Sequence, residues 1–484
     1  MILTTTFLCF CLASAFNYFR TRRQRLLIKN LKGPITWPLM GSIQKLLFLN
    51  PKNFFKQSKD YLTKFGLFSR CWIFHRLFIP VADLELTRQL LENETSLETG
   101  CELMKDWLKD GILMCQQDKW QHRHGLISRL FINENMERLT DLCRQEAEAL
   151  LPKLSERADE EVFDIREIIS PSILNLIVRV TCGVSPSDNY AKALNDLTEL
   201  YRKRFLSLQS ANRFNYWLSC PFMRRRQNKL IKILNQEHKD LISRHRQEQL
   251  KKVNGLEGNP SEPLPQIWHE SLLRILLESQ DPQLTDEEIC AELNTCNYFG
   301  YMLCSAALCF ALVSIARNPT VQQGSQEELQ KCKIDHKKWQ LEKLSYLEAV
   351  LQETLRLYPP QVILQRQLKE DFPYTHSVVG DAVLPHGAEI YVNLHEMQRI
   401  ENRYPTPNNF QPDRFLNNST ELLSFGMGPR SCPAKKFTFN LLKAFLAPLV
   451  TNFELLPYGN ELRLSLRLVL GSSNGFQLAL KERK

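Results

Sequence analysis

The residues with the clearest capacity for chemistry surround one cysteine near the C-terminal end of the chain. They read Phe425-Gly426-Met427-Gly428-Pro429-Arg430-Ser431-Cys432-Pro433. Glycines let the backbone approach a bulky group closely, and Arg430 supplies a permanent positive charge. Pro433 suits the first turn of a helix, and the dipole of a helix stabilises a cysteine at its N-terminus as the thiolate. The pattern predicts a thiolate beside a bulky group.

A second candidate is the pair Glu353 and Arg356, which is followed by Leu357-Tyr358-Pro359-Pro360. Residues three apart share one face of a helix, so the two side chains can form an ion pair. Such pairs are common on helices and are by themselves weak evidence of function.

Together these motifs resemble the cytochrome P-450 superfamily of haem-thiolate monooxygenases. Glu353 and Arg356 are similar to its Glu-x-x-Arg element, and Pro412-Asp413-Arg414-Phe415 is similar to its Pro-Glu-Arg-Phe element. The stretch from Phe425 to Cys432 resembles its cysteine-ligand loop. Phe163-Asp164-Ile165 and the segment 284–289 look most like the fatty-acid-hydroxylase clan. The resemblance extends over residues 32–480.

The resemblance implies a cofactor and a set of site residues. Cys432 would be the axial thiolate ligand of a haem b iron, with Phe425 beside it in the loop. A buried free cysteine fits its apolar neighbours but not the glycines and the arginine. Haem propionates would be bound by Arg430, by Arg366 and by Trp120, which is similar to the tryptophan of the Trp-x-x-x-Arg element. Glu353, Arg356 and Arg414 would form a buried structural triad.

One position in that binding set departs from the family pattern, which has arginine four residues after the tryptophan. The fourth residue after Trp120 is His124, and Arg123 lies one position earlier. Adjacent helix positions point about 100° apart, because a helix has about 3.6 residues per turn. The sequence leaves open whether His124 or Arg123 binds the propionate.

The larger departure lies in the segment Phe299-Gly300-Tyr301-Met302-Leu303-Cys304. Gly300 matches the glycine of the oxygen-site helix, but Met302 replaces the family's acid and Leu303 replaces its threonine. That pair delivers protons to the oxygen site, and two apolar side chains can neither donate a proton nor order a water molecule. Phe299 replaces the glutamate that some clan members esterify to haem, so we expect the haem to be bound non-covalently.

Three functions follow from the resemblance and from these departures. The first is a monooxygenase that inserts one oxygen atom into a lipophilic substrate, such as a fatty acid, steroid or xenobiotic. It would receive electrons from NADPH through a flavoprotein reductase, which Lys435 and Lys436 would attract. The second is a haem-thiolate isomerase or dehydratase, which needs no proton relay. The third is a haem-binding protein without turnover.

Helical periodicity dominates the segments that must position these residues. Residues 110–317 read mainly as helices, with an apolar, proline-free segment from Asp286 to Arg317 as a buried central helix. Short strands alternate with helices between Phe54 and Leu90 and again beyond Pro359, and Lys435 to Thr451 reads as a helix. The fold class is therefore mainly α with a smaller β portion, preceded by one N-terminal transmembrane helix, with residues 43–484 as a single haem-binding domain.

The N-terminal segment carries the charge imbalance of the chain. The formal net charge is +9. Residues 1–59 contain ten basic residues and no acid, so the remainder is nearly neutral. A nucleic-acid-binding protein would carry its basic patch on the folded domain, so this class is excluded. Fourteen cysteines lie scattered without a zinc-binding spacing, which is typical of a reducing compartment.

Residues 1–19 lack charge and would span about 28 Å as a helix, close to the thickness of the membrane hydrocarbon. The basic cluster that opens at Arg20 would keep the following chain on the cytosolic face of the endoplasmic reticulum. Ala13-Ser14-Ala15 resembles a signal-peptide cleavage site, but the positive charge of a signal peptide precedes its apolar run. We therefore expect an uncleaved anchor, followed by a basic flank and a Pro/Gly hinge over residues 20–42.

Overall fold

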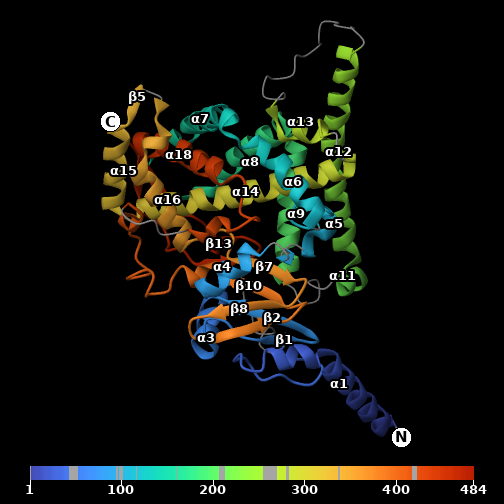
Figure 1. The fold of residues 1–484 in the computed structure, drawn as a ribbon. Helices are drawn as coiled ribbons and strands as arrows, with labels where there is room; N and C mark the ends of the chain where they lie inside the picture. Colours follow the sequence, from blue (N-terminus) through green and yellow to red (C-terminus); the bar gives the residue numbers. More distant parts are fainter. Residues whose placement is uncertain are drawn as a thin grey trace. The chain divides into compact units, whose positions relative to one another are not determined.

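The computed structural model describes residues 2–42, 53–93, 96–97, 102–115, 117–159, 161–206, 213–253, 270–279, 283–335, 338–416 and 422–483. The chain is mainly helical with a smaller β portion, as predicted (Figure 1). It divides into two units. Unit 1 comprises residues 1–100, 361–408 and 423–432, and unit 2 comprises residues 101–360, 409–422 and 433–484.

A five-stranded sheet forms the centre of unit 1, in the order β1-β2-β10-β7-β3. Strand β10 pairs in parallel with β2 and antiparallel with β7. Alternate residues of β2 are buried, which is the period expected of a strand with one face on the core. The elements of unit 1 are α1 (Ile2–Leu27), α3 (Phe54–Phe65), β1 (Cys71–Ile73), β2 (Arg76–Val81), α4 (Leu84–Glu92), β3 (Ser96–Leu97), β7 (Ile363–Leu368), β8 (Phe372–His376), β9 (Gly380–Leu384), β10 (Glu389–Asn393), α17 (Leu394–Met397) and η5 (Leu423–Phe425).

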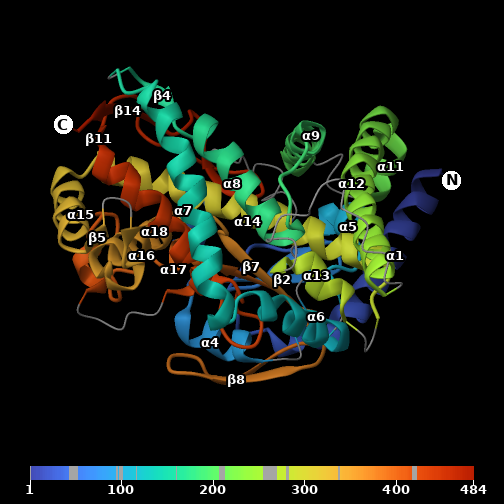
Figure 2. The same cartoon turned by 90° about the horizontal axis from the view of Figure 1, so that it is seen from above.

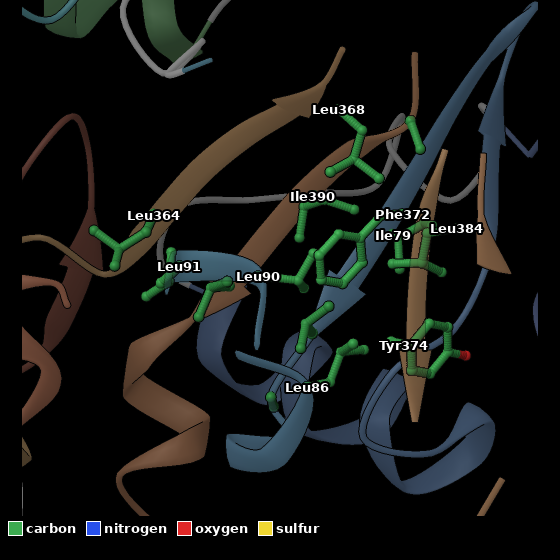
Figure 3. Packing of buried hydrophobic residues seen from close by; sticks show 14 of the residues in the cluster. Ile79, Leu86, Leu90, Leu91, Leu364, Leu368, Phe372, Tyr374, Leu384 and Ile390 are labelled. Atoms are coloured by element: carbon green, nitrogen blue, oxygen red, sulfur yellow. The ribbon is translucent and has the colours of Figure 1, made fainter. Parts of the chain in front are cut away.

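Helix α4 covers this sheet and closes the core of unit 1. Asp83 caps the helix by accepting a hydrogen bond from the backbone N–H of Leu86 at 2.8 Å. Leu86 and Leu90 then point toward Ile79 and Phe372, as Figure 3 shows. The alternation of short strands and helices predicted between Phe54 and Leu90 is therefore confirmed.

Helix α1 extends through the basic cluster and ends at Leu27, eight residues beyond the predicted span. No glycine or proline interrupts the chain before Gly33, so nothing in the sequence stops the helix at Phe19. Its C-terminal turns contact the rest of unit 1, because Gln24 donates to the carbonyl of His386 at 2.8 Å. In its N-terminal half the side chains of Phe7, Leu8, Phe10 and Leu12 are exposed.

In the described part of the chain, one helix is long and apolar enough to cross a membrane. This helix is α14, and most of it is buried inside the protein. Helix α1 does not meet the same criterion. The N-terminal anchor and the boundaries 1–19, 20–42 and 43–484 therefore stay predictions.

Unit 2 consists of helices packed around α14, with α8 against it and α7 against α18 (Figure 2). A small sheet, β11-β14-β4, completes the unit. The elements are η1 (Glu102–Met104), α5 (Lys105–Leu108), α6 (Gln117–Leu130), α7 (Asn133–Ser155), β4 (Phe163–Asp164), α8 (Arg166–Cys182), α9 (Asp188–Leu206), α11 (Arg213–Ser219), α12 (Pro221–Val253), α13 (Leu272–Leu277), α14 (Asp286–Ala316), α15 (Pro319–Lys331), β5 (Lys333–Asp335), β6 (Lys338–Trp339), η3 (Leu341–Lys343), α16 (Ser345–Leu357), η4 (Pro412–Phe415), α18 (Lys435–Asn452), β11 (Phe453–Leu456), β12 (Leu464–Leu466), β13 (Leu470–Ser472) and β14 (Gln477–Glu482).

The predicted central helix is confirmed as α14, within one residue at its C-terminal end. Thr285 and Glu288 form a capping box, in which each side chain accepts a hydrogen bond from the backbone N–H of the other residue. The helix ends just before Asn318-Pro319, where the residue before a proline is pushed out of the helical conformation. The predicted C-terminal helix is also confirmed, as α18.

Candidate functional site

The loop that carries Cys432 lies in unit 1 and is closed by its own backbone. The N–H of Cys432 donates to the carbonyl of Phe425 at 2.9 Å, and the N–H of Ser431 donates to that of Gly428 at 3.1 Å. The Cys432 side chain is exposed to solvent. Among the described residues no cysteine forms a disulfide, so each is present as a thiol.

Gly428 is required by the shape of this loop. Its φ is +68°, in the left-handed region that other residues rarely adopt. A Cβ atom added there would lie 2.4 Å from the carbonyl oxygen of Leu91. The turn thus brings the loop backbone tightly against the end of α4 and presents Cys432 at its far end. An exposed thiol behind a tight, glycine-built turn fits a haem iron, for which thiolate is an established ligand.

The two predicted propionate-binding arginines of unit 1 differ in burial. Arg366 lies on β7 on the same face as Leu364 and Leu368, and only 2% of it is exposed. Its Nη1 donates to the carbonyl of Gln365 at 2.9 Å. Arg430 is half-buried in the cysteine loop. Both guanidinium groups are permanent cations, as an anionic propionate requires.

Trp120 and His124 lie on one face of α6 in unit 2. They are four residues apart, and their ring centroids are 4.8 Å apart with an angle of 31° between the planes. Trp120 is buried and His124 is half-buried. The two candidates for a propionate contact are therefore presented together.

Arg123 points away from that face and is fully buried against α14. Its Nη1 donates to Glu292 Oε1 at 2.5 Å, and its Nη2 donates to Glu288 Oε1 at 2.7 Å. Nη1 also donates to the carbonyl of Asp110 at 2.8 Å. The sequence left open whether His124 or Arg123 binds the propionate. In the structure, the guanidinium of Arg123 is held by two carboxylates.

Burial and charge act on this pair in opposite directions. Burial favours the neutral form of Glu292 and raises its pKa, although the charge of Arg123 lowers it in part. Burial alone would lower the pKa of Arg123, but the carboxylate of Glu292, together with Cys115 and Glu288, outweighs burial and the pKa is raised. Sequence reasoning missed the pair. The spacing of Glu288 and Glu292, four residues apart on one helix face, is the signal that suggests a basic partner.

The predicted triad residues meet in unit 2. Glu353 and Arg356 on α16 are both completely buried, and Arg356 Nε donates to Glu353 Oε2 at 2.6 Å while Nη2 donates to Oε1 at 2.8 Å. Arg414 from η4 donates through Nε to Glu353 Oε1 at 3.1 Å. The backbone N–H of Gln411 adds a bond of 2.9 Å to the same oxygen. Glu353 therefore links α16 to the segment that precedes the cysteine loop in the chain.

Helix α14 is buried along most of its length, but one stripe is only half-buried. The stripe consists of Cys296, Phe299, Gly300, Leu303 and Ala306, which recur at helical spacing. It carries no carboxylate and no hydroxyl group. Of the two residues that replace the acid and threonine, Leu303 lies on the stripe, whereas Met302 is 4% exposed and packs into the interior.

Comparison with known proteins agrees with this geometry. The family model for cytochrome P450 matches residues 31–478. Probable cytochrome P450 316a1 of Drosophila melanogaster is 67% identical over 484 residues, the full length of both chains. Cytochrome P450 4d8 of the same organism is 32% identical over 91% of this chain and all of its own, and cytochrome P450 4d2 is 29% identical over 94% of each. The chain therefore belongs to the cytochrome P450 family and is a haem-dependent monooxygenase, an oxidoreductase.

Proposed function

We propose that the protein is a membrane-bound monooxygenase that inserts one oxygen atom into a lipophilic substrate. The exposed Cys432 thiol at the end of its glycine-built loop carries this proposal. When bound there, haem supplies an iron that the thiolate enriches in electron density, which favours O–O cleavage. Phe299 replaces the glutamate to which some family members attach haem, so the haem b is non-covalent.

Side chains of this protein would hold the haem by binding its negatively charged propionate groups. Arg366 and Arg430 bind propionate groups as permanent cations, and Trp120 and His124 add donors from one face of α6. Arg123 stabilises α6 against α14 instead, because Glu292 and Glu288 occupy its guanidinium. Glu353, Arg356 and Arg414 act on the fold of unit 2 rather than on the cofactor.

The apolar stripe of α14 supports a lipophilic substrate. Phe299, Leu303 and Ala306 offer aromatic and aliphatic surface. Gly300 lets Ile177 of α8 pack closely against the helix, because a Cβ there would lie only 3.1 Å from Ile177 Cγ2. A fatty acid, a steroid or a xenobiotic is compatible with these contacts. Because the stripe lacks a carboxylate and a hydroxyl, we expect proton delivery to be slow.

The membrane and the electron donor complete the proposal. Exposed apolar side chains on α1, such as Phe7 and Phe16, together with Trp37 and Phe74 elsewhere in unit 1, support an anchor in the endoplasmic reticulum membrane. The arginines that follow in the chain favour a catalytic part on the cytosolic side.

Electrons would come from NADPH through a flavoprotein reductase, and the exposed side chains of Lys435 and Lys436 suit its acidic surface.

The first experiment tests the ligand. The reduced, carbon-monoxide-bound spectrum of purified protein should show the band typical of a thiolate ligand. Cys432→Ser should lose that band and keep the far-ultraviolet circular dichroism of the native protein. A Cys432→Ser protein with an unchanged thiolate band would exclude this residue as the ligand.

The second experiment tests the reaction. Protein reconstituted with a flavoprotein reductase in lipid vesicles should oxidise at least one member of a lipid extract, detected by mass spectrometry. NADPH consumption that ends only in hydrogen peroxide would contradict effective monooxygenation. Turnover of a lipid hydroperoxide without reductase would support the isomerase alternative, which the apolar stripe of α14 also permits.

A further inference from the structure

The cysteine loop, residues 423–432 of unit 1, is held in place by few buried side chains. Leu423 is completely buried in the core of the unit, whereas the other residues of the loop are half-buried or exposed. Gly426 and Gly428 have no side chain, and their φ values are +72° and +68°. Because glycine restricts the backbone less than other residues do, the loop depends on contacts with the rest of unit 1 for a fixed shape.

A hydrogen bond from Ser424 links the start of this loop to the residue that follows α17. The hydroxyl of Ser424 donates to Gln398 Oε1 at 3.2 Å. Gln398 is only 1% exposed. Loss of the Ser424 donor would therefore remove a hydrogen bond that water cannot readily replace.

The position of Gln398 is fixed by the central sheet and the core of unit 1. Strand β10 ends at Asn393, whose side chain caps α17 by accepting from the N–H of Glu396 at 3.1 Å. The N–H of Gln398 donates to the carbonyl of Leu394 at 3.0 Å at the other end of this helix. Leu394 and Met397 are completely buried in the core. Gln398 thus offers its acceptor from a well-anchored turn of the chain.

Ser424 lies between two backbone hydrogen bonds that shape the loop. The N–H of Gly426 donates to the carbonyl of Leu423 at 2.9 Å and closes the turn η5. The carbonyl of Phe425 accepts from the N–H of Cys432, also at 2.9 Å. A rotation of the turn at Ser424 would displace both carbonyls, and the backbone of Cys432 would move with the second one.

We propose that Gln398 is a positioning residue for Cys432. By accepting the hydrogen bond from Ser424, it fixes the turn at the start of the cysteine loop and, through the carbonyl of Phe425, the backbone of the cysteine. Its importance for the haem rests on the proposed function, in which Cys432 is the thiolate ligand. Gly428 anchors the loop further along, against the end of α4, so the two contacts act at different points.

Variants of the two partners isolate this hydrogen bond. Ser424→Ala removes the donor, and Gln398→Met removes the acceptor but keeps a side chain of similar length. In each variant the reduced carbon-monoxide complex should lose its thiolate band about fivefold faster than in the native protein, as expected for one neutral hydrogen bond. The double variant should lose the band no faster than the single variants, because the same bond is already absent. Ser424→Thr keeps the hydroxyl and should retain the native lifetime.

Ser377→Ala is the matched control. Ser377 lies on the turn between β8 and β9, and its hydroxyl donates to Glu85 Oε2 at 2.7 Å. The variant therefore loses a serine hydrogen bond of unit 1 outside the cysteine loop, and its thiolate band should last as long as the native one. Far-ultraviolet circular dichroism and thermal unfolding of all variants distinguish a displaced loop from a general loss of structure.

Hydrogen–deuterium exchange of the peptide that contains residues 423–432 tests the loop without reference to the ligand. Ser424→Ala and Gln398→Met should each speed exchange of the Cys432 N–H. A native protein without a thiolate band would contradict the proposed function, whereas faster exchange in these variants would still support the role of Gln398. Unchanged exchange in both single variants, or effects that add in the double variant, would overturn the proposal. If the native protein shows the thiolate band, an equal lifetime of that band in Ser424→Ala would also overturn it.

Discussion

Arg123 and Glu292 form an ion pair in the interior of unit 2, with Nη1 of the arginine 2.5 Å from Oε1 of the glutamate. At most 1% of either side chain is exposed. The pair connects α6, which carries Trp120 and His124, to α14, which carries the half-buried stripe. It therefore fixes the position of one helix of the proposed site relative to the other.

Removal of one partner should strongly destabilise the protein. Arg123→Leu leaves the Glu292 carboxylate buried without its cation, and such changes cost about 3–5 kcal/mol. The double variant Arg123→Leu with Glu292→Leu should recover most of this loss, because no charge is then left in the interior. Urea unfolding followed by circular dichroism measures both free energies. A double variant as unstable as the single one would show that the charges are not the cause.

The free energy of unfolding should depend on pH through Glu292, and the direction of its pKa shift fixes the sign of this dependence. The pKa of Glu292 is raised in the folded protein above its ordinary value of 4.5, so the folded state binds a proton more tightly than the unfolded state. Its contribution to stability is then fully present below pH 4.5 and is lost as the pH rises through the folded pKa. Glu292→Gln should remove this decline. Unfolding free energies of both proteins at a series of pH values above 4.5 provide the measurement.

Glu288 provides the opposite sign and therefore a control. Hydrogen bonds from Thr285 and the charge of Arg123 lower its pKa despite partial burial. Its contribution is present above pH 4.5 and is lost as the pH falls through the lowered pKa. Glu288→Gln should thus alter the acid side of the stability profile only. If Glu288→Gln changes the stability equally below and above pH 4.5, the lowered pKa of Glu288 is contradicted.

The triad should be essential for a folded, haem-loaded protein. Glu353→Gln leaves Arg356 completely buried without a counter-charge, so we expect a loss of about 3–5 kcal/mol and little recovered haem. Arg274→Ala, which removes an exposed ion pair with Glu278, should cost at most about 1 kcal/mol. Thermal unfolding and haem absorbance per protein chain report on both. Normal haem content in Glu353→Gln would show that the triad has no structural role.

Local patterns predicted much of the fold, and the reason lies in sequence spacing. The buried helix α14 follows from an apolar run between a capping box and a proline, and the contact of Glu353 with Arg356 follows from their separation of three. The partner of Arg123 could not be predicted in this way. Its two glutamates are more than 160 residues away in the chain, so only the packing of α6 on α14 brings them together.

The length of α1 and the burial of Met302 likewise could not be predicted from local sequence patterns. A change in hydropathy after Phe19 marks a possible membrane boundary, but helical hydrogen bonding continues to Leu27 because no residue interrupts it. Met302 and Leu303 are adjacent in sequence, yet they point about 100° apart on α14. A motif comparison treats them as a pair, whereas the structure leaves only Leu303 half-buried.

Gly428 should be critical for presenting Cys432. Gly428→Ala places a Cβ 2.4 Å from the carbonyl oxygen of Leu91 at a φ of +68°, so the loop must shift. We expect a weaker thiolate band in the carbon-monoxide spectrum and a lower melting temperature. Gly380→Ala is the matched control, because its φ is +75° but no atom lies within 4 Å of the added Cβ. If both variants weaken the thiolate band equally, the cause is backbone strain at a positive φ and not the contact with Leu91.

Leu303→Thr should increase the share of NADPH electrons that end in oxidised substrate. The substitution puts a hydroxyl group, which can donate a proton and order water, on the half-buried stripe of α14. Leu303→Val is the control, since valine has the β-branched shape of threonine without its hydroxyl. Met302→Asp should not help, because a carboxylate at this buried position destabilises the helix instead. The ratio of product to hydrogen peroxide, measured in reductase-reconstituted vesicles, compares the variants. If Leu303→Val and Leu303→Thr give the same ratio, the shape of the side chain at this position, rather than proton delivery, limits the reaction.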